Sequence, residues 1–480
     1  MGSLKNFFSR VNKLSPAAKA SFWFVVSSVV LRGISFITTP IFTRLLNVED
    51  YGKTSVFVTW EGMISIFATL SLSGGVYNVA MTKYEDDIDT FTSSMLGLTV
   101  LVSTIVYLFC GVLNTFVPKI FELDNSFILF MWIQTMMTAA SSFWIMRKRF
   151  VYDYKKVILF TFANALLCPI VAIIAVLLFP GHKAYAKIVG AGIPGIAIGC
   201  FLGVSAWWKG KALFHGQYWK YALGFNLPLL PHYLATVIFN SGDKLMINSM
   251  VGAAEVGFYS IAHSITGLIE LVTHSINHSL IPFTLQCIKK KQTRNLHRYF
   301  FMCSLVVSVV CVGVLLFARE GILIFATPAY LNAVYFIAPL TFAVQMSFVS
   351  GLLGNILFYY EKTGLMSLMT MICGSINIVA NYIGIRYWGY VAVGYTTLLC
   401  CFVRLVLYYL CVRKYENHLS EIISIKLLAL VLMGFAFFVP IGILLKDNLW
   451  GRIGVVAVVL LLMGLNVKNI AAFFKKMRAS

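Results

Sequence analysis

Apolar residues gather into about fourteen segments of roughly 20 residues, separated by short polar or basic stretches. A helix of that length crosses a hydrocarbon core about 30 Å thick. The pattern therefore predicts an all-α polytopic membrane protein with about 14 transmembrane helices. The predicted spans are 18–46, 52–75, 92–117, 126–146, 157–179, 188–208, 219–242, 255–283, 298–318, 330–358, 364–385, 389–412, 422–445 and 450–466.

Composition supports a membrane protein, because 59 % of the residues are hydrophobic, only 12 % are charged and the mean hydropathy is +0.84. The net charge of +20 raises the alternative of nucleic-acid binding. The Lys and Arg residues follow membrane topology instead: 26 of the 38 fall on one side of the predicted bilayer and ten on the other. By the positive-inside rule both termini are cytoplasmic, and no nucleic-acid partner is expected.

Ten cysteines lie in or beside the apolar spans without the spacing of a metal site. We therefore expect no disulfide, no metal and no cofactor. The first apolar run continues without a small-residue cleavage site, which indicates an uncleaved first helix rather than a signal peptide.

An internal repeat appears at an offset of 205 residues, which aligns Glu49–Gly52 with Ala254–Gly257. Two six-helix lobes of parallel topology would be related by a pseudo-two-fold axis along the membrane normal, with a cavity between them for alternating access. The predicted parts are an N-terminal lobe at 1–210, a C-terminal lobe at 211–415, and helices 13 and 14 with a basic cytoplasmic tail at 416–480. The alternative is chance similarity.

Prolines interrupt the first helix of each predicted lobe, Pro40 in one and Pro228 and Pro231 in the other. A proline removes one backbone hydrogen bond and kinks the helix, so these positions are candidate hinges. The alternative is a pair of static kinks filled by packing.

Arg32 is a cation within an apolar segment, where a charge is costly unless it faces a cavity or a partner. Thr39 and Thr43 share its helical face, which predicts a hydrated lining suited to an anionic ligand. This helix has no carboxylate before Glu49, although a proton-coupled exporter of cationic drugs would need one. The alternative is a structural Arg32 paired with a carbonyl or with Glu61.

Carboxylates in the predicted spans are candidates for coupling to H⁺ or Na⁺. Glu270 shares one face of its helix with His263, His274 and His278, and Glu61 lies at a related place in the other lobe. A packing role for the individual histidines is the alternative.

Asp243 and Lys244 lie where their helix meets the external surface. Asp243 can pair with Lys244 or with Arg44 as an external gate, and a solvated ion pair of little energetic weight is the alternative. Neutral Asn377 and Asn381 are suited to hold sugar hydroxyls or to join helices.

Several motifs carry a resemblance to a known family. They are Pro40-Ile-Phe-Thr-Arg-Leu-Leu-Asn-Val-Glu-Asp-Tyr-Gly52, Ser241–Ile247 with Glu255–Ile261, and Asn377–Asn381 with Gly389–Gly394. Together they resemble bacterial polysaccharide (O-antigen type) flippases of the multidrug/oligosaccharidyl-lipid/polysaccharide (MOP) exporter superfamily. The usual proline of the helix 11–12 turn is replaced by Arg386-Tyr-Trp. Helices 13 and 14 resemble the extra pair of the lipid II flippases.

The resemblance implies a flippase, not an enzyme, that moves an undecaprenyl-pyrophosphate-linked oligosaccharide across the bacterial plasma (inner) membrane. In this interpretation Arg32, assisted by Arg44 and Thr39, receives the pyrophosphate. The partners implied are the polyprenyl-linked oligosaccharide, membrane lipid and other polysaccharide assembly proteins. The alternatives are a cation-coupled multidrug exporter of the same superfamily, or a membrane polysaccharide polymerase or glycosyltransferase, which would normally have a large external loop.

Overall fold

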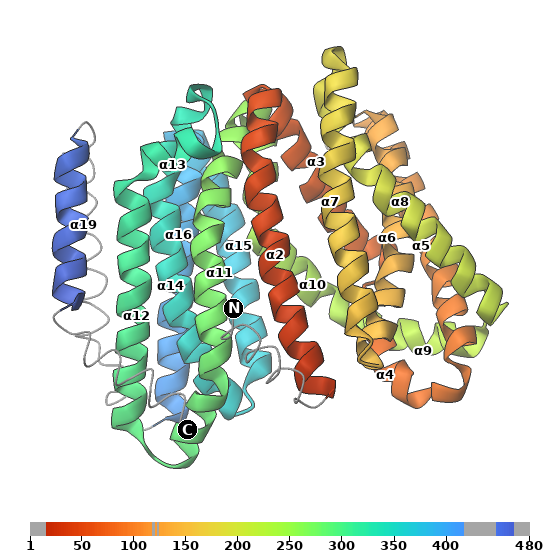
Figure 1. The fold of residues 1–480 in the computed structure, drawn as a ribbon. Helices are drawn as coiled ribbons and strands as arrows, with labels where there is room; N and C mark the ends of the chain where they lie inside the picture. Colours follow the sequence, from red (N-terminus) through yellow and green to blue (C-terminus); the bar gives the residue numbers. More distant parts are fainter. Residues whose placement is uncertain (1–15, 118–120, 122–123, 417–447, 465–480) are drawn as a thin grey trace, which may run out of the picture. The chain divides into compact units, whose positions relative to one another are not determined.

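The computed structural model describes residues 16–117, 121, 124–416 and 448–464, and within these ranges it is helical with no β-strand (Figure 1). The chain divides into two compact units, Met1–Gly257 and Phe258–Ser480. The all-α prediction is therefore confirmed for the described residues. The lobe boundary between 210 and 211 stays a prediction.

Unit 1 is built around four long helices that pack side by side, α5 to α8 (Figure 1). Helix α8 contacts α5, α6 and α7, while α2 runs along α7 and α10 packs against α3. Its helices are α2 (Pro16–Leu45), α3 (Val48–Thr69), α4 (Val76–Lys83), η1 (Glu85–Asp87), α5 (Ile88–Phe116), α6 (Asn125–Phe150), α7 (Tyr154–Leu178), η2 (Pro180–His182), α8 (Lys183–Gly210), α9 (Gly216–Asn226), η3 (Leu227–Leu229) and α10 (Leu230–Met250), followed by the start of α11 (Ala253–Lys289).

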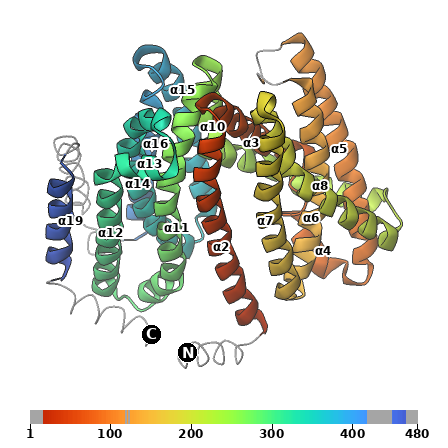
Figure 2. The same ribbon diagram turned by 45° about the horizontal axis from the view of Figure 1, so that its top comes forward.

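Unit 2 is arranged around α14, which packs against α12, α15 and α16 (Figure 2). An 18-residue window of α14 is 78 % buried, so its apolar residues face protein on all sides. After α11, the helices of this unit are α12 (Thr293–Leu316), α13 (Ala318–Phe325), η4 (Pro328–Ala333), α14 (Val334–Tyr359), α15 (Thr363–Trp388), α16 (Ala392–Tyr415) and α19 (Leu449–Gly464).

Most predicted spans correspond to one helix, but two are divided. The span predicted at 52–75 ends at Thr69, and the short helix α4 follows it after a turn. The span predicted at 219–242 is α9, η3 and α10, because Pro228 lies in the 3₁₀ turn between the two α-helices. The span at 422–445 lies outside the described residues.

Nine helical stretches of the described chain are long and apolar enough to cross a membrane, so the predicted number of about 14 is not confirmed. Helices α3 and α10 are not among the nine. The length and composition of these nine stretches are those of a multi-pass helical membrane protein.

Two glycines mark a very close helix crossing inside unit 1. A Cβ atom on Gly52 of α3 would lie 1.6 Å from the carbonyl oxygen of Ala253, and one on Gly257 would lie 2.5 Å from the carbonyl oxygen of Val48. The repeat offset of 205 maps Val48 onto Ala253 and Gly52 onto Gly257. The contact is therefore reciprocal, as expected for duplicated segments related by a two-fold axis.

Candidate functional site

Helix α2 carries the residues predicted to receive an anion. The hydroxyl of Thr39 donates to the Ser35 carbonyl at 2.8 Å, and Arg44 Nη1 donates to the Pro40 carbonyl at 2.8 Å. Arg32 lies in the same helix, but its side chain is outside the described part of the structure. Helix α2 runs without a break through Pro40, whereas Pro231 lies in the first turn of α10, where proline needs no N–H partner. The hinge roles stay predictions.

Glu61 is partly buried in the middle of α3, beside a cluster of apolar side chains that includes Trp60 and Tyr107. Its charge acts on Tyr107, whose hydroxyl shares a 2.8 Å hydrogen bond with Thr135. The carboxylate of Glu61 has no ion pair or hydrogen bond with another described side chain. A carboxylate in such surroundings is costly, which favours a functional role over a structural one.

Two lysines at the start of α8 were not among the candidates from the sequence, and the structure gives them specific contacts. Lys183 Nζ donates to the Leu45 carbonyl at 3.0 Å. Lys187 Nζ donates to Thr54 Oγ1 at 2.9 Å and lies over two rings, at 4.7 Å from the centroid of Phe42 and 4.3 Å from that of Tyr51. The four-residue spacing of the lysines, which places them on one helical face, was the signal that could have revealed them.

Asp243 is buried in α10, with 3 % of the residue exposed, so a solvated position for it is wrong. Lys244 follows it and interacts with it electrostatically. Helix α10 packs against α3 within unit 1. This burial does not fit a solvated surface ion pair, and the role of Asp243 as a gate or an ion site stays a prediction.

Helix α11 places His263 and Glu270 two turns apart, and both are partly buried in unit 2. The His263 ring lies 6.1 Å from that of Tyr259, and the backbone carbonyl of Glu270 accepts a bond from Thr273. His274 is exposed, and the side chain of His278 lies outside the described residues. Of the polar residues predicted to share one face of α11, His263 and Glu270 are therefore partly buried and His274 is not.

Asn377 and Asn381 are brought together on α15, with 2 % and 0 % of each residue exposed. Asn381 Nδ2 donates to Asn377 Oδ1 at 3.2 Å, and the hydroxyl of Thr396 on α16 donates to Asn381 Oδ1. The amides thus join two helices and form a buried polar cluster. On the same helix α16, Arg404 Nη2 donates to Ser347 of α14 at 2.7 Å, so its guanidinium is held inside the bundle.

Arg452 at the start of α19 is buried, with 4 % of the residue exposed. Its two terminal nitrogens each donate to Glu320 at 2.7 Å, and Nη1 also donates to the Leu316 carbonyl at 3.0 Å. Burial of the Glu320 carboxyl raises its pKa, but the bonds and charge of Arg452 lower it more, so this pKa lies below its ordinary value. The bonds of the Arg452 guanidinium to Glu320 and to the Leu316 carbonyl hold α19 against α12 and α13.

No group of three or more His, Cys, Asp or Glu side chains suited to a metal ion occurs among the residues that the structure describes. The polar side chains described above are amides, hydroxyls and cations together with the carboxylates of Glu61, Asp243 and Glu270. The amides, hydroxyls and cations are suited to anions and hydroxyl groups, and the carboxylates are suited to cations.

The comparisons with known proteins agree with this helical membrane architecture. The sequence profile of the family described as "Polysaccharide biosynthesis protein" matches residues 17–287. The "Lsg locus putative protein 1" of Haemophilus influenzae is 19 % identical over 387 residues, which cover 78 % of this chain and 94 % of that protein. An "Uncharacterized membrane protein" of the same organism is 20 % identical, covering 72 % and 84 %.

Two solved structures share the fold. The lipid II flippase MurJ in an inward closed conformation has a TM-score of 0.64 at 13 % identity and covers 92 % of this chain and 99 % of its own. An inward-facing multidrug resistance transporter of the MATE family, in the MOP superfamily, has a TM-score of 0.56 at 14 % identity, with coverage of 82 % and 95 %. The profile match spans more than half of the chain, which therefore belongs to the polysaccharide biosynthesis protein family and has a fold similar to that of MOP-superfamily transporters.

Proposed function

We propose that the protein is a flippase that moves an undecaprenyl-pyrophosphate-linked oligosaccharide from the cytoplasmic to the outer leaflet of a bacterial plasma membrane by alternating access. The observation that carries the proposal is the match of residues 17–287 to the polysaccharide biosynthesis family, on a transporter-like helical fold. The translocation makes and breaks no covalent bond, so the protein is not an enzyme in this proposal. Both termini are cytoplasmic.

In the proposed mechanism, cations near α2 hold the charged end of the substrate. Arg32 and Arg44 receive the pyrophosphate because a guanidinium binds phosphate oxygens in a bidentate manner. The hydroxyl of Thr39 adds polarity to the same helix. The amides of Asn377 and Asn381 are buried and bonded in the described conformation, so in this proposal they hold sugar hydroxyls only in a state of the cycle that exposes them, while the polyprenyl tail stays in lipid.

Coupling to H⁺ or Na⁺ through buried carboxylates is the second part of the proposal. Glu61 has no described ion-pair partner and Asp243 is buried, so each is suited to take up a cation during the cycle. Glu270 and His263 form a further candidate pair on one face of α11. Lys244 interacts electrostatically with the neighbouring Asp243. If neutralising Glu61, Glu270 and Asp243 together leaves transport unchanged across pH and sodium gradients, this coupling is wrong.

A cation-coupled multidrug exporter is the alternative, favoured by the likeness to a MATE-family transporter. Against it, α2 carries no carboxylate within its bounds, Pro16–Leu45. A polymerase or glycosyltransferase is a more distant alternative.

The deciding experiment measures lipid-linked oligosaccharide in cells that lack the protein, with rescue by the intact chain and by Arg32→Ala at matched expression. The proposal expects accumulation on the cytoplasmic leaflet, relieved by the intact chain and not by the variant. Unchanged lipid intermediates together with lost drug resistance would favour the exporter. Other polysaccharide assembly proteins, the remaining proposed partners, would be sought by crosslinking in the same cells.

A further inference from the structure

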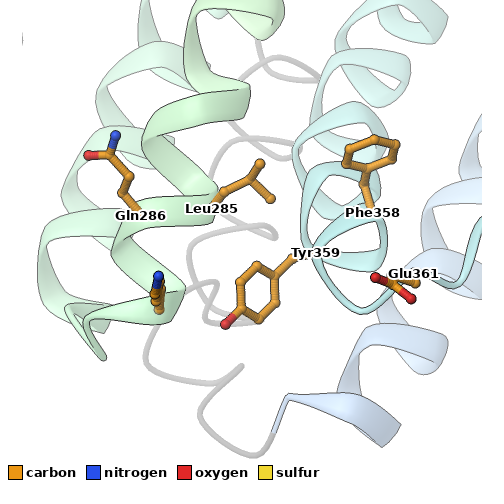
Figure 3. Close-up of a pocket in the computed structure, with 6 residues that line it drawn as sticks. Leu285, Gln286, Phe358, Tyr359 and Glu361 are labelled. Atoms are coloured by element: carbon orange, nitrogen blue, oxygen red, sulfur yellow. The ribbon is translucent and has the colours of Figure 1, made fainter.

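A cavity of about 560 Å³ lies within unit 2, between the C-terminal ends of α11 and α14. It is lined by Leu285, Gln286, Lys289, Phe358, Tyr359 and Glu361. Figure 3 shows Leu285 pointing from α11 toward α14 and the ring of Tyr359 pointing back toward α11. The proposed flippase function uses none of these six residues.

The cavity lies beyond or at the ends of the neighbouring candidate membrane spans, as expected for a membrane interface. Tyr359 is the last residue of one candidate span, and the candidate span of α12 begins at Leu296, shortly after the turn that follows α11. A tyrosine at this level is typical of the boundary between hydrocarbon and headgroups. The cavity therefore opens where a phospholipid places its phosphate and the first carbons of its chains.

The walls of the cavity combine apolar surface with an available cation. Leu285 is half-buried and Phe358 is 54 % exposed, so the Phe358 ring offers surface that other described side chains leave uncovered. The ammonium of Lys289 has no ion pair or hydrogen bond with any described residue, and the hydroxyl of Tyr359 has no hydrogen bond there either. These are two donors without an acceptor beside an apolar wall.

Charge around the cavity favours an anion. Four further exposed basic residues follow Lys289, namely Lys290 and Lys291 in the turn after α11 and Arg294 and Arg298 in the first turns of α12. Glu361 is the single acidic residue in the lining. Basic residues at a helix C-terminus also complement the helix dipole, but that role needs no cavity and no apolar wall.

We propose that this cavity binds an anionic phospholipid of the surrounding leaflet, with its phosphate at Lys289 and the Tyr359 hydroxyl and its acyl chain along Leu285 and Phe358. The polyprenyl-phosphate substrate has related chemistry, a phosphate on an apolar chain. The phospholipid is favoured because it is always present at this depth and because none of the residues assigned to transport lines the cavity.

The test is native mass spectrometry of the full-length protein in detergent, titrated separately with phosphatidylglycerol, phosphatidylcholine, undecaprenyl phosphate and inorganic phosphate. The intact protein should bind phosphatidylglycerol in preference to phosphatidylcholine. Lys289→Gln should weaken that binding about fivefold, as expected for one interfacial lysine. Lys290→Gln is the matched control, because it removes the same charge one residue away and does not line the cavity. An unchanged melting temperature shows that both variants are folded.

Three outcomes would overturn the proposal. Equal binding of the two phospholipids would remove the selectivity, and equal losses in Lys289→Gln and Lys290→Gln would reduce the effect to general surface charge. Binding that depends on Lys289 for undecaprenyl phosphate or inorganic phosphate, but not for phosphatidylglycerol, would assign the cavity to the substrate or to a free anion. Phe358→Ala should weaken phosphatidylglycerol binding while leaving binding of inorganic phosphate unchanged, which tests the apolar wall.

Discussion

Lys187 in unit 1 and Arg452 in unit 2 are basic side chains held by protein contacts, and they differ in the kind of partner that each one has. Arg452 has a carboxylate partner in a two-pronged contact with Glu320. Lys187 has one hydroxyl, Thr54, and two aromatic rings, with no carboxylate contact among the described residues. A cation that is paired with a carboxylate stabilises a helix junction, whereas a cationic side chain without a carboxylate partner is a candidate to meet an anionic ligand.

The largest effect is expected when the carboxylate partner of Arg452 is removed. Glu320→Gln leaves a guanidinium that is 4 % exposed without its counter-charge, and should lower the free energy of unfolding by about 3 kcal/mol. The measurement is an SDS titration of the purified protein. The double variant Glu320→Leu with Arg452→Met should recover most of the loss, because it leaves no buried charge unpaired. If the single and double variants lose the same free energy of unfolding, the pair does not stabilise the protein through its charges.

A smaller effect of the same pair should appear as a dependence on pH. The pKa of Glu320 is lowered in the folded protein, so its stabilisation is complete above the ordinary carboxyl pKa and is lost as the pH falls through the lowered value. The melting temperature of the intact protein should therefore fall more steeply below about pH 4.5 than that of Glu320→Gln. Parallel pH profiles for the two proteins would contradict this linkage.

Neither cation contact was accessible to sequence analysis, although the helices themselves were. Glu320 and Arg452 are 132 residues apart, and no local spacing in the sequence links them. Helices α7 and α14 show why packing was also hidden: 11 % of a window in α7 is buried against 78 % in α14, yet both are apolar all round. Lipid and protein interior are equally apolar, so hydrophobic periodicity cannot tell a lipid-facing helix from a central one.

Contacts of the candidate-site residues within one helix could be predicted from the sequence, but contacts between helices could not. Asn377 and Asn381 lie four residues apart, and helical geometry alone brings them together. The partner of Lys187 lies 133 residues away, and its identity depends on how α3 and α8 pack. Local spacing therefore predicted contacts within a helix, and it missed those between helices.

The hydroxyl that holds Lys187 should contribute less than the carboxylate that holds Arg452. Thr54→Val keeps the shape of the buried side chain but removes the acceptor of the 2.9 Å bond, and should cost about 1 kcal/mol. Thr59→Val is the matched control, because the Thr59 hydroxyl is equally buried in α3 and bonds only the Ser55 carbonyl of its own helix. If the two valine variants are equally stable in the SDS titration, the bond to Lys187 adds nothing.

The smallest effect on stability, and the sharpest test of the comparison, is expected for Lys187→Met. Methionine fills the space of the lysine stem against Phe42 and Tyr51 and removes the charge, so the free energy of unfolding should change by less than about 0.5 kcal/mol. Arg452→Met should cost several times more, because Glu320 is then left in a half-buried position without its cation. A lysine that is dispensable for folding but placed among aromatic rings in a transporter-like unit is expected to serve the passage of an anion. Lys187→Met should then lower oligosaccharide export in cells at unchanged protein level. If Lys187→Met is destabilised as much as Arg452→Met, Lys187 is a structural residue and the two cations do not differ in role.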